Sequence, residues 1–286
     1  MSGGAGAEAP WPAPAKLNLM LRVVGRRDDG YHLLQTLFQF VDLSDELRFE
    51  PRPGGLIRRL TAISGVPAKD DLTVRAAHLL QQHTGCGLGA DIRIHKRLPM
   101  GGGLGGGSSD AATTLVALNR LWGTGVDDDE LAALGLRLGA DVPVFVRGCS
   151  AWGEGVGDEL QPVDLARPWY LILKPKCHVS TGEIFADPEL TRDSCRITIA
   201  DFVAGADQND CLPVVRKRYP AVGRALQWLD PYGKPRLTGT GACVFAAFEH
   251  ESGARIALRS VPEDVDAFVA RGLNRSPLLD RLSLDR

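Results

Sequence analysis

The chain has 286 residues, a formal net charge of −2 at pH 7, and a composition that is 44% hydrophobic and 24% charged. These values predict a soluble globular protein with one large domain or two of ordinary size. They argue against a dedicated nucleic-acid binder, which would usually carry a basic excess, and no apolar run approaches the roughly 18 residues of a membrane span. The six cysteines lie far apart without a C-x-x-C pair, which favours reduced thiols in the cytoplasm over disulfides or a zinc site.

Residues 1–11 have neither the basic nor the apolar region of a signal peptide, and we expect them to be disordered. Order is expected from about Pro12, and alternation predicts a strand over residues 15–23. Lys16 and Asn18 fall on one face of this strand, opposite an apolar face that comprises Leu17, Leu19, Leu21 and Val23. Lys16 is either a solvated lysine at the start of the strand or a cation directed into a cleft.

An Asp-Gly step within residues 26–30 predicts a hairpin turn, followed by strands over 33–38 and 47–50 and a turn over 51–55. Between the first turn and its strand lie Tyr31 and His32. Without further information, Tyr31 would be a half-buried strand aromatic and His32 a surface histidine.

A helix is expected over residues 71–83, capped at Asp70 or Asp71 and ended by Gly85. Its two histidines, His78 and His83, suit a solvated or partly packed face, and we assign them no chemistry. A strand over residues 90–96 follows.

The next stretch, residues 98–115, is exceptionally rich in glycine: Gly101, Gly102, Gly103, Gly105, Gly106 and Gly107. Such a run opposes regular structure and predicts a loop between the preceding strand and a helix, which Ser108, Ser109 or Asp110 could cap. Free N–H groups and the positive end of a helix dipole would converge there on an anion, and a nucleotide phosphate suits the site best. A flexible linker is the alternative, although linkers seldom have such regular flanks. The loop lacks the G-K-[ST] ending of a Walker A loop and the position of a dinucleotide-binding loop.

The second half alternates shorter elements. A helix is expected over 127–139, and Asp141 follows it as a turn or N-cap aspartate. A glycine-rich turn at 153–158, a domain boundary at 162–168 and a buried strand over 169–174 come next. The remaining expected elements are a short helix or loop over 181–185, a helix from Asn209-Asp210 through Tyr219, a second glycine loop running into a strand over 237–246, a helix over 252–258 and a strand over 265–270.

Several of these motifs together resemble the GHMP small-molecule kinases. The resemblance rests on five segments: P-A-K-x-N-L at 14–19, G-R-R-x-D-G-Y-H-x-L-Q-T at 25–36, G-L-G-G-G-S-S-D-A-A at 103–112, G-A-D-V-P-x-F at 139–145, and the glycine loop at 237–246. The first four resemble in particular the branch that phosphorylates the 2-hydroxyl of a cytidine diphosphate-linked methylerythritol in non-mevalonate isoprenoid synthesis.

The resemblance implies a role for each matching residue. Lys16 and Asp141 would be catalytic, with ATP and Mg²⁺ as cofactors. Substrate would contact Asn18, Tyr31, His32, Phe185 and Thr240, with the cytosine ring between Tyr31 and Phe185, although Phe185 could equally be plain core. The ATP-binding residues would be Pro99, Met100, Gly101, Gly102, Gly103, Leu104, Gly105, Gly106, Gly107, Ser108 and Ser109. The magnesium ligands are not fixed, since Ser108, Ser109 and Asp110 all qualify.

The family also implies an α+β fold of two domains, a ribosomal-S5-like N-terminal domain over 12–162 and a ferredoxin-like C-terminal domain over 163–286. We expect a cytoplasmic enzyme with a small-molecule substrate and no nucleic-acid or membrane partner, either a monomer or a homodimer. The rival interpretations are another GHMP enzyme, such as a mevalonate or homoserine kinase, a non-catalytic binding protein on the same fold, and a dinucleotide oxidoreductase.

Overall fold

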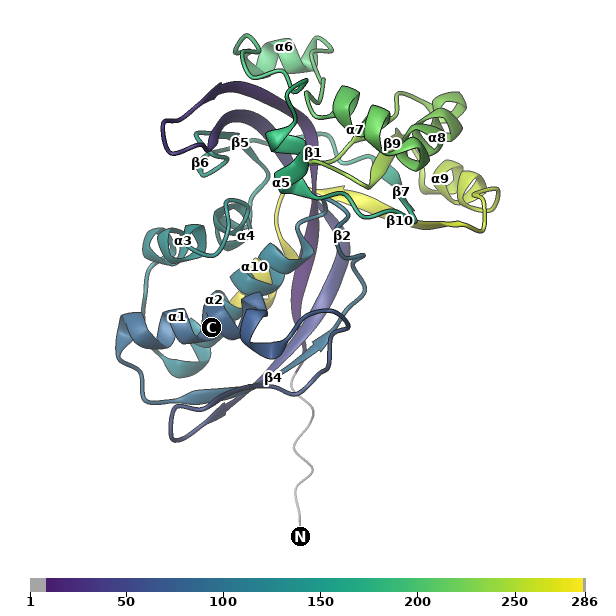
Figure 1. Cartoon of the computed structure of the whole chain (residues 1–286). Coiled ribbons are helices and arrows are strands. Elements are labelled where there is room, and N and C mark those ends of the chain that lie inside the picture. The colour runs from purple at the N-terminus through teal and green to yellow at the C-terminus, as the bar shows by residue number, and fades with distance from the viewer. Residues whose placement is uncertain (1–8, 285–286) are drawn as a thin grey trace.

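The computed structural model describes residues 9–284 and has an α+β fold, as expected (Figure 1). Its strands form one connected sheet in the order β3-β4-β2-β10-β7-β9-β8, with β1 and β5 also paired to β2 and β6 paired to β5. Among the strands of residues 9–284, only β3 and β4 pair in parallel. The strands of the first half are β1 (Trp11–Arg26), β2 (His32–Arg52), β3 (Ile57–Arg59), β4 (Gly89–His95), β5 (Ala151–Glu154) and β6 (Glu159–Pro162).

Two long antiparallel strands, β1 and β2, run side by side through both halves of the molecule (Figure 1). The strands expected over 33–38 and 47–50 are one continuous strand, because different segments of β2 pair with β1, β4, β5 and β10. The start of β1 contributes Trp11 to the first core, its middle contributes Leu17 to a central core, and its end contributes Val23 to a third core in the second half. This strand therefore ties the two halves together.

The first two helices of the first half pack on its strands, and the next two pack chiefly against those helices. In chain order they are α1 (Leu72–Thr84), α2 (Gly106–Trp122), α3 (Asp128–Leu136) and α4 (Val142–Arg147), after a 3₁₀ turn at Ala68–Asp70. The Asp71 side chain accepts a hydrogen bond from the N–H of Thr73, and Gly85 ends α1 in the left-handed conformation, which confirms both predicted ends. The buried helix α2 contributes most of its length to the first core.

The second half is an antiparallel sheet of β7 (Trp169–Pro175), β8 (Arg236–Leu237), β9 (Val244–Phe248) and β10 (Val265–Leu273). Figure 1 shows its helices gathered around these strands. They are α5 (Thr181–Ala186), α6 (Ile199–Val203), α7 (Leu212–Arg218), α8 (Pro220–Leu229) and α9 (Glu251–Leu258), with a 3₁₀ turn at Asp230–Tyr232. The sequence did not predict α4, α6, α8 or the last helix, α10 (Pro277–Leu284).

The expectation that residues 1–11 are disordered is wrong at Trp11. Residues 1–8 lie outside the described residues, but Trp11 begins β1 and is only 2% exposed. The Arg281 guanidinium lies 4.7 Å from the centre of its ring, so α10 covers this strand. Leu278 of α10 belongs to the first core, although the sequence placed the helix's residues in the C-terminal domain. The boundary near residue 162 stays a prediction.

Two predicted helix starts are wrong. The helix α2 begins at Gly106 with Gly105 as its N-cap, so Ser108, Ser109 and Asp110 lie inside it and none caps it. A left-handed glycine turns the chain directly into the helix there, with φ of 74°. The helix α7 begins at Leu212 rather than at Asn209-Asp210, because these two residues form a turn against β1: the Asp210 N–H donates to the Leu21 carbonyl, and Asn209 Oδ1 accepts from the Cys211 N–H.

Candidate active site

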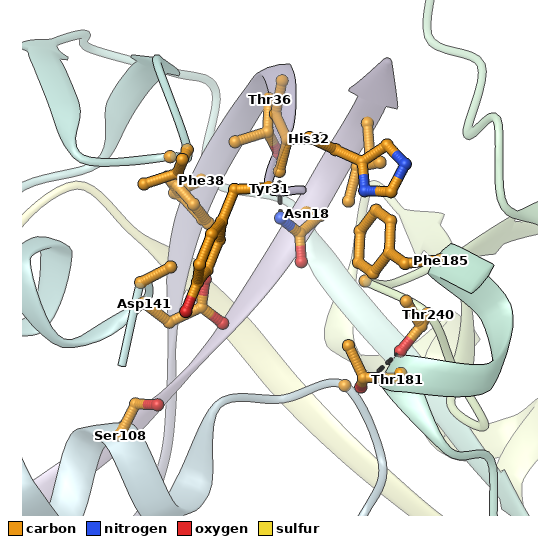
Figure 2. A pocket seen from close by; sticks show the side chains of 18 of the residues that line it. Asn18, Tyr31, His32, Thr36, Phe38, Ser108, Asp141, Thr181, Phe185 and Thr240 are labelled. Carbon is orange, nitrogen blue, oxygen red and sulfur yellow. Dashed lines mark hydrogen bonds between the residues drawn. The ribbon is translucent and has the colours of Figure 1, made fainter. Parts of the chain in front are cut away.

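A cavity of about 640 Å³ opens between the two halves, within the size range of small-molecule sites. Every residue that the sequence assigned to catalysis or to substrate binding lines it: Lys16, Asn18, Tyr31, His32, Asp141, Phe185 and Thr240. Figure 2 shows all of these except Lys16, which is not labelled there, converging from segments that lie far apart in the chain. Of the predicted ATP-binding residues, Gly103 and Ser108 line the same cavity.

Lys16 lies on the cavity face of β1 and is almost completely buried. Its ammonium group contacts the Asp141 carboxylate at 3.1 Å and donates hydrogen bonds to Asn18 Oδ1 at 2.5 Å and to the Gly103 carbonyl at 3.2 Å. These three oxygens match the three N–H donors of a charged lysine. The directed-cation interpretation is therefore the one that the geometry favours.

Asp141 occupies the N-cap position of α4, but its side chain makes no cap hydrogen bond. Its carboxylate turns instead toward Lys16 and keeps 35% of its side-chain surface exposed in the cavity. A carboxylate that is paired with a cation on one side and open on the other can accept a proton from a bound molecule.

Asn18 is held from several sides. Its side-chain N–H donates to Thr36 Oγ1 at 2.8 Å, and the Thr36 hydroxyl donates in turn to the Met20 carbonyl at 2.7 Å. Its backbone N–H donates to Thr238 Oγ1 at 3.0 Å. This chain of bonds fixes the amide so that its oxygen faces Lys16.

The first glycine loop docks against the second. The Gly102 carbonyl accepts from the N–H of Cys243 at 3.1 Å, and the Gly103 carbonyl accepts from the Thr238 hydroxyl at 3.2 Å. A Cβ atom at Gly103 would lie 2.3 Å from the Thr238 carbonyl oxygen, at a φ of +76°. The neighbouring loop therefore requires a glycine at this position, independently of any bound phosphate.

The start of α2 supplies free backbone donors. The N–H groups of Gly106, Gly107 and Ser108 form no hydrogen bond with any part of the chain from residue 9 to 284. Unpaired N–H groups in a first helical turn, together with the helix dipole, attract an anion. Ser108 carries this turn to the edge of the cavity (Figure 2).

A buried charge cluster anchors the start of the same loop. Asp45 accepts hydrogen bonds from the backbone N–H groups of Arg97 and Leu98, and Lys96 contacts both Asp45, at 2.5 Å, and Asp110, at 2.7 Å. Burial raises the pKa of the Asp110 carboxyl to about 8, with a further increase from the charge of Asp45. Asp110 does not line the cavity, and its second carboxyl oxygen, Oδ1, is buried without a hydrogen-bond partner among the described residues.

The second glycine loop, residues 237–246, forms the wall of the cavity on the side of the second half, where Gly239 and Thr240 line it. Asn209 donates from its side chain to the carbonyls of Leu237, at 3.0 Å, and Gly239, at 2.9 Å, which shapes the loop. The Thr240 hydroxyl pairs with that of Thr181 at the start of α5, at 2.9 Å. The loop is thus joined to the segment that carries Phe185.

The far end of the cavity is aromatic. Figure 2 shows Tyr31 on one side and His32 with Phe185 on the other. The His32 and Phe185 rings stack with their centres 5.0 Å apart and an interplanar angle of 26°. The Tyr31 side is open, since 63% of this residue is exposed, so a flat ring could enter between Tyr31 and Phe185. Burial, followed by the nearby charges of Arg192 and Arg26, lowers the pKa of His32 and keeps its ring neutral near pH 7.

The sequence missed several residues that shape this site. Thr36 and Thr181 line the cavity, and Arg192 donates to His32 from outside it. Thr36 lies within a quoted motif and could have been found from it, whereas Arg192 lies in a segment without any pattern. In the part of the chain that the structure describes, no three His, Cys, Asp or Glu side chains form a metal-binding group, and no helix is both long and apolar enough to cross a membrane.

Sequence comparisons find known relatives over most of the chain. Residues 71–149 match the family model of the GHMP kinases N terminal domain, and residues 192–267 match that of the GHMP kinases C terminal domain. A 4-diphosphocytidyl-2-C-methyl-D-erythritol kinase from Nitrosococcus oceani is 58% identical over 95% of this chain and 97% of its own length. A protein of the same name from Alkalilimnicola ehrlichii is 60% identical over 95% of this chain and 94% of its own.

Solved structures of kinases are also similar to this chain. The crystal structure of a 4-(cytidine 5'-diphospho)-2C-methyl-D-erythritol kinase superposes with a TM-score of 0.81 at 31% identity, over 92% of this chain and 98% of the other. A mevalonate kinase superposes with a TM-score of 0.68 at 17% identity, over 93% and 99% of the two chains, which shows a shared fold.

Proposed function

This chain belongs to the 4-diphosphocytidyl-2-C-methyl-D-erythritol kinase family of the GHMP kinases, and from this we propose its reaction. The protein transfers the γ-phosphoryl group of ATP to the 2-hydroxyl of 4-diphosphocytidyl-2-C-methyl-D-erythritol. The products are the 2-phosphate and ADP, and the step belongs to the non-mevalonate route to isoprenoid precursors.

The observation that carries the proposal is the Lys16–Asp141 pair, 3.1 Å apart in the cavity that also holds the end of the first glycine loop. Asp141 accepts the proton of the attacking hydroxyl. Lys16 contacts that carboxylate and stabilises the developing alkoxide, because a positive charge favours negative charge on the reacting oxygen. Phosphoryl transfer otherwise requires chiefly positioning and neutralised charge.

The first turn of α2 would hold the ATP phosphates through its unpaired N–H groups. Mg²⁺ is usually bound by one or two protein oxygens together with phosphate oxygens and water, so a cluster of several ligands is not needed. Of the three candidate ligands, Ser108 is the one that lines the cavity, and its hydroxyl fits this role. When bound, the ion would neutralise charge on the phosphates.

The aromatic end of the cavity suits a pyrimidine. Tyr31 and Phe185 offer faces to stack on, worth about 1–3 kcal/mol per base in nucleic-acid systems. Stacking alone does not separate cytosine from uracil, whose ring faces are similar. Discrimination falls to hydrogen bonds at the ring edge, which we assign to His32 and the neighbouring backbone.

A substrate panel tests the proposal. The purified protein with ATP and Mg²⁺ is offered the CDP-linked methylerythritol, its UDP-linked analogue, mevalonate and homoserine, and ADP formation and product mass are measured. We expect turnover of the CDP-linked compound and a much lower kcat/KM for the UDP-linked one. A preference for mevalonate or homoserine would show a different GHMP enzyme, and binding without turnover of any compound would show a non-catalytic protein.

A further inference from the structure

Arg192 lies behind the nucleobase end of the cavity, and every one of its hydrogen bonds goes to groups that build this end. Its Nη atoms donate to the carbonyls of Leu190, at 3.0 Å, and of Phe185 and Asp187, both at 2.8 Å. Its Nε–H points to Nε2 of His32 at 3.1 Å. The guanidinium is thus held in place by three carbonyls and presents its fourth bond to the histidine.

This fourth bond determines the form of His32. A guanidinium has only donors, so the ring nitrogen that faces it must accept and cannot carry a proton. In a neutral imidazole the proton then sits on the other nitrogen, because the bond made by one nitrogen fixes the state of its partner. Among residues 9–284, no group forms a hydrogen bond with Nδ1 of His32, and the residue lines the cavity.

We propose that Arg192 is a positioning residue for base recognition, which locks His32 as the Nδ1–H tautomer and so presents a hydrogen-bond donor to the ring edge of the bound base. The choice of cytosine as that base rests on the proposed function, whereas the tautomer does not. The lowered pKa of His32 agrees, since a protonated ring could not accept from Arg192.

The tautomer matters because cytosine and uracil differ at N3. In cytosine this atom is an acceptor, and in uracil it carries a hydrogen and is a donor. A ring with a fixed Nδ1–H pairs with the first and opposes the second. A ring that is free to move its proton to Nε2 could accept from uracil as well, so releasing the lock should relax selectivity.

The same guanidinium ties down the neighbouring wall. The Phe185 and Asp187 carbonyls that it binds lie at the C-terminal end of α5, where helix carbonyls lack partners within the helix. Loss of Arg192 could therefore also loosen the Phe185 ring. A useful experiment must separate this structural effect from the effect on the tautomer.

The direct test is NMR of the protein labelled with ¹⁵N-histidine, which has only six histidines to resolve. The His32 signals are identified by their loss in His32→Gln. In the parent protein we expect a pyrrole-type shift at Nδ1 and a pyridine-type shift at Nε2. Arg192→Met, which keeps an apolar stem but has no donor, should give a mixture of tautomers, and Arg192→Lys, which still has only donors, should restore the parent pattern.

The functional test compares kcat/KM for the CDP-linked and UDP-linked substrates. Arg192→Met should lower the CDP-to-UDP preference about 10-fold, the scale set by one unpaired polar group, through KM rather than kcat. Arg192→Lys should recover most of this preference. Arg218→Met is the matched control, because Arg218 pairs with the Asp187 carboxylate in the same wall without touching His32, and it should leave the preference unchanged.

Each result decides the inference. A proton on Nε2 of His32 in the parent protein, or an unchanged tautomer in Arg192→Met, overturns it. Equal losses for both substrates in Arg192→Met would reduce Arg192 to a support for Phe185 and also overturn it. If the parent phosphorylates neither substrate, the proposed function fails, while the NMR spectra still decide the tautomer lock. Should Arg192→Met not fold, the parent and Arg192→Lys spectra remain decisive.

Discussion

Replacing Gly103 with alanine should separate the two glycine loops and destabilise the protein. The added Cβ would lie 2.3 Å from the Thr238 carbonyl oxygen and 3.1 Å from that of Gly241, and both are backbone atoms that cannot rotate away. The φ of +76° adds a cost of about 1–2 kcal/mol for any residue with a Cβ, and overpacking adds about 1–3 kcal/mol. We therefore expect the free energy of unfolding to fall by about 2–5 kcal/mol.

Moving the backbone at Gly103 should also lower the catalytic rate. The Gly103 carbonyl accepts from Lys16 and from Thr238, so moving it disturbs the lysine that contacts Asp141. The variant should lose kcat as well as stability, even at temperatures where it remains folded. Urea unfolding followed by circular dichroism, combined with ADP-release kinetics at low temperature, measures both effects.

Gly107→Ala is the matched control in the same glycine run. Its Cβ would meet only Leu72 Cδ1, at 3.5 Å, and the position is helical without a positive φ. Alanine favours helices, so the free energy of unfolding of this variant should equal that of the parent or exceed it by up to about 1 kcal/mol. Parental stability and kinetics in Gly103→Ala would refute the claim that contact between the loops makes this glycine necessary.

Two further predictions concern catalysis and thiol reactivity. Asp141→Asn should lower kcat by about 10²–10⁴, the usual contribution of a general base, with little change in ATP affinity; turnover within a few-fold of the parent would remove Asp141 from the mechanism. All six cysteines are free thiols, and burial raises the pKa of Cys211 and of Cys243 to about 12, so neither forms thiolate near pH 8. A maleimide reagent should label exposed Cys195 in the folded protein and these two only after unfolding; rapid labelling of Cys243 in the folded state would contradict the packing.

The sequence alone determined those features that depend on neighbours along the chain. The Asp71 cap and the Gly85 stop define α1 through the preferences of single residues, and the glycine run predicts the loop that the structure has over residues 101–105, whereas Gly106 and Gly107 already belong to α2. The short motifs at 103–112, around Lys16 and around Asp141 together suggested the family, and with it the residues of the cavity.

Only the tertiary structure decided which groups meet across the chain. Gly103 is required by a carbonyl 135 positions away, and Arg192 reaches a histidine 160 positions away. Trp11 is core rather than disordered because a helix from the opposite end of the chain covers it. The physical reason is that local preferences act over a few residues, whereas burial and hydrogen-bond pairing act between whatever groups the folded chain brings together, and a sequence pattern carries no record of those distances.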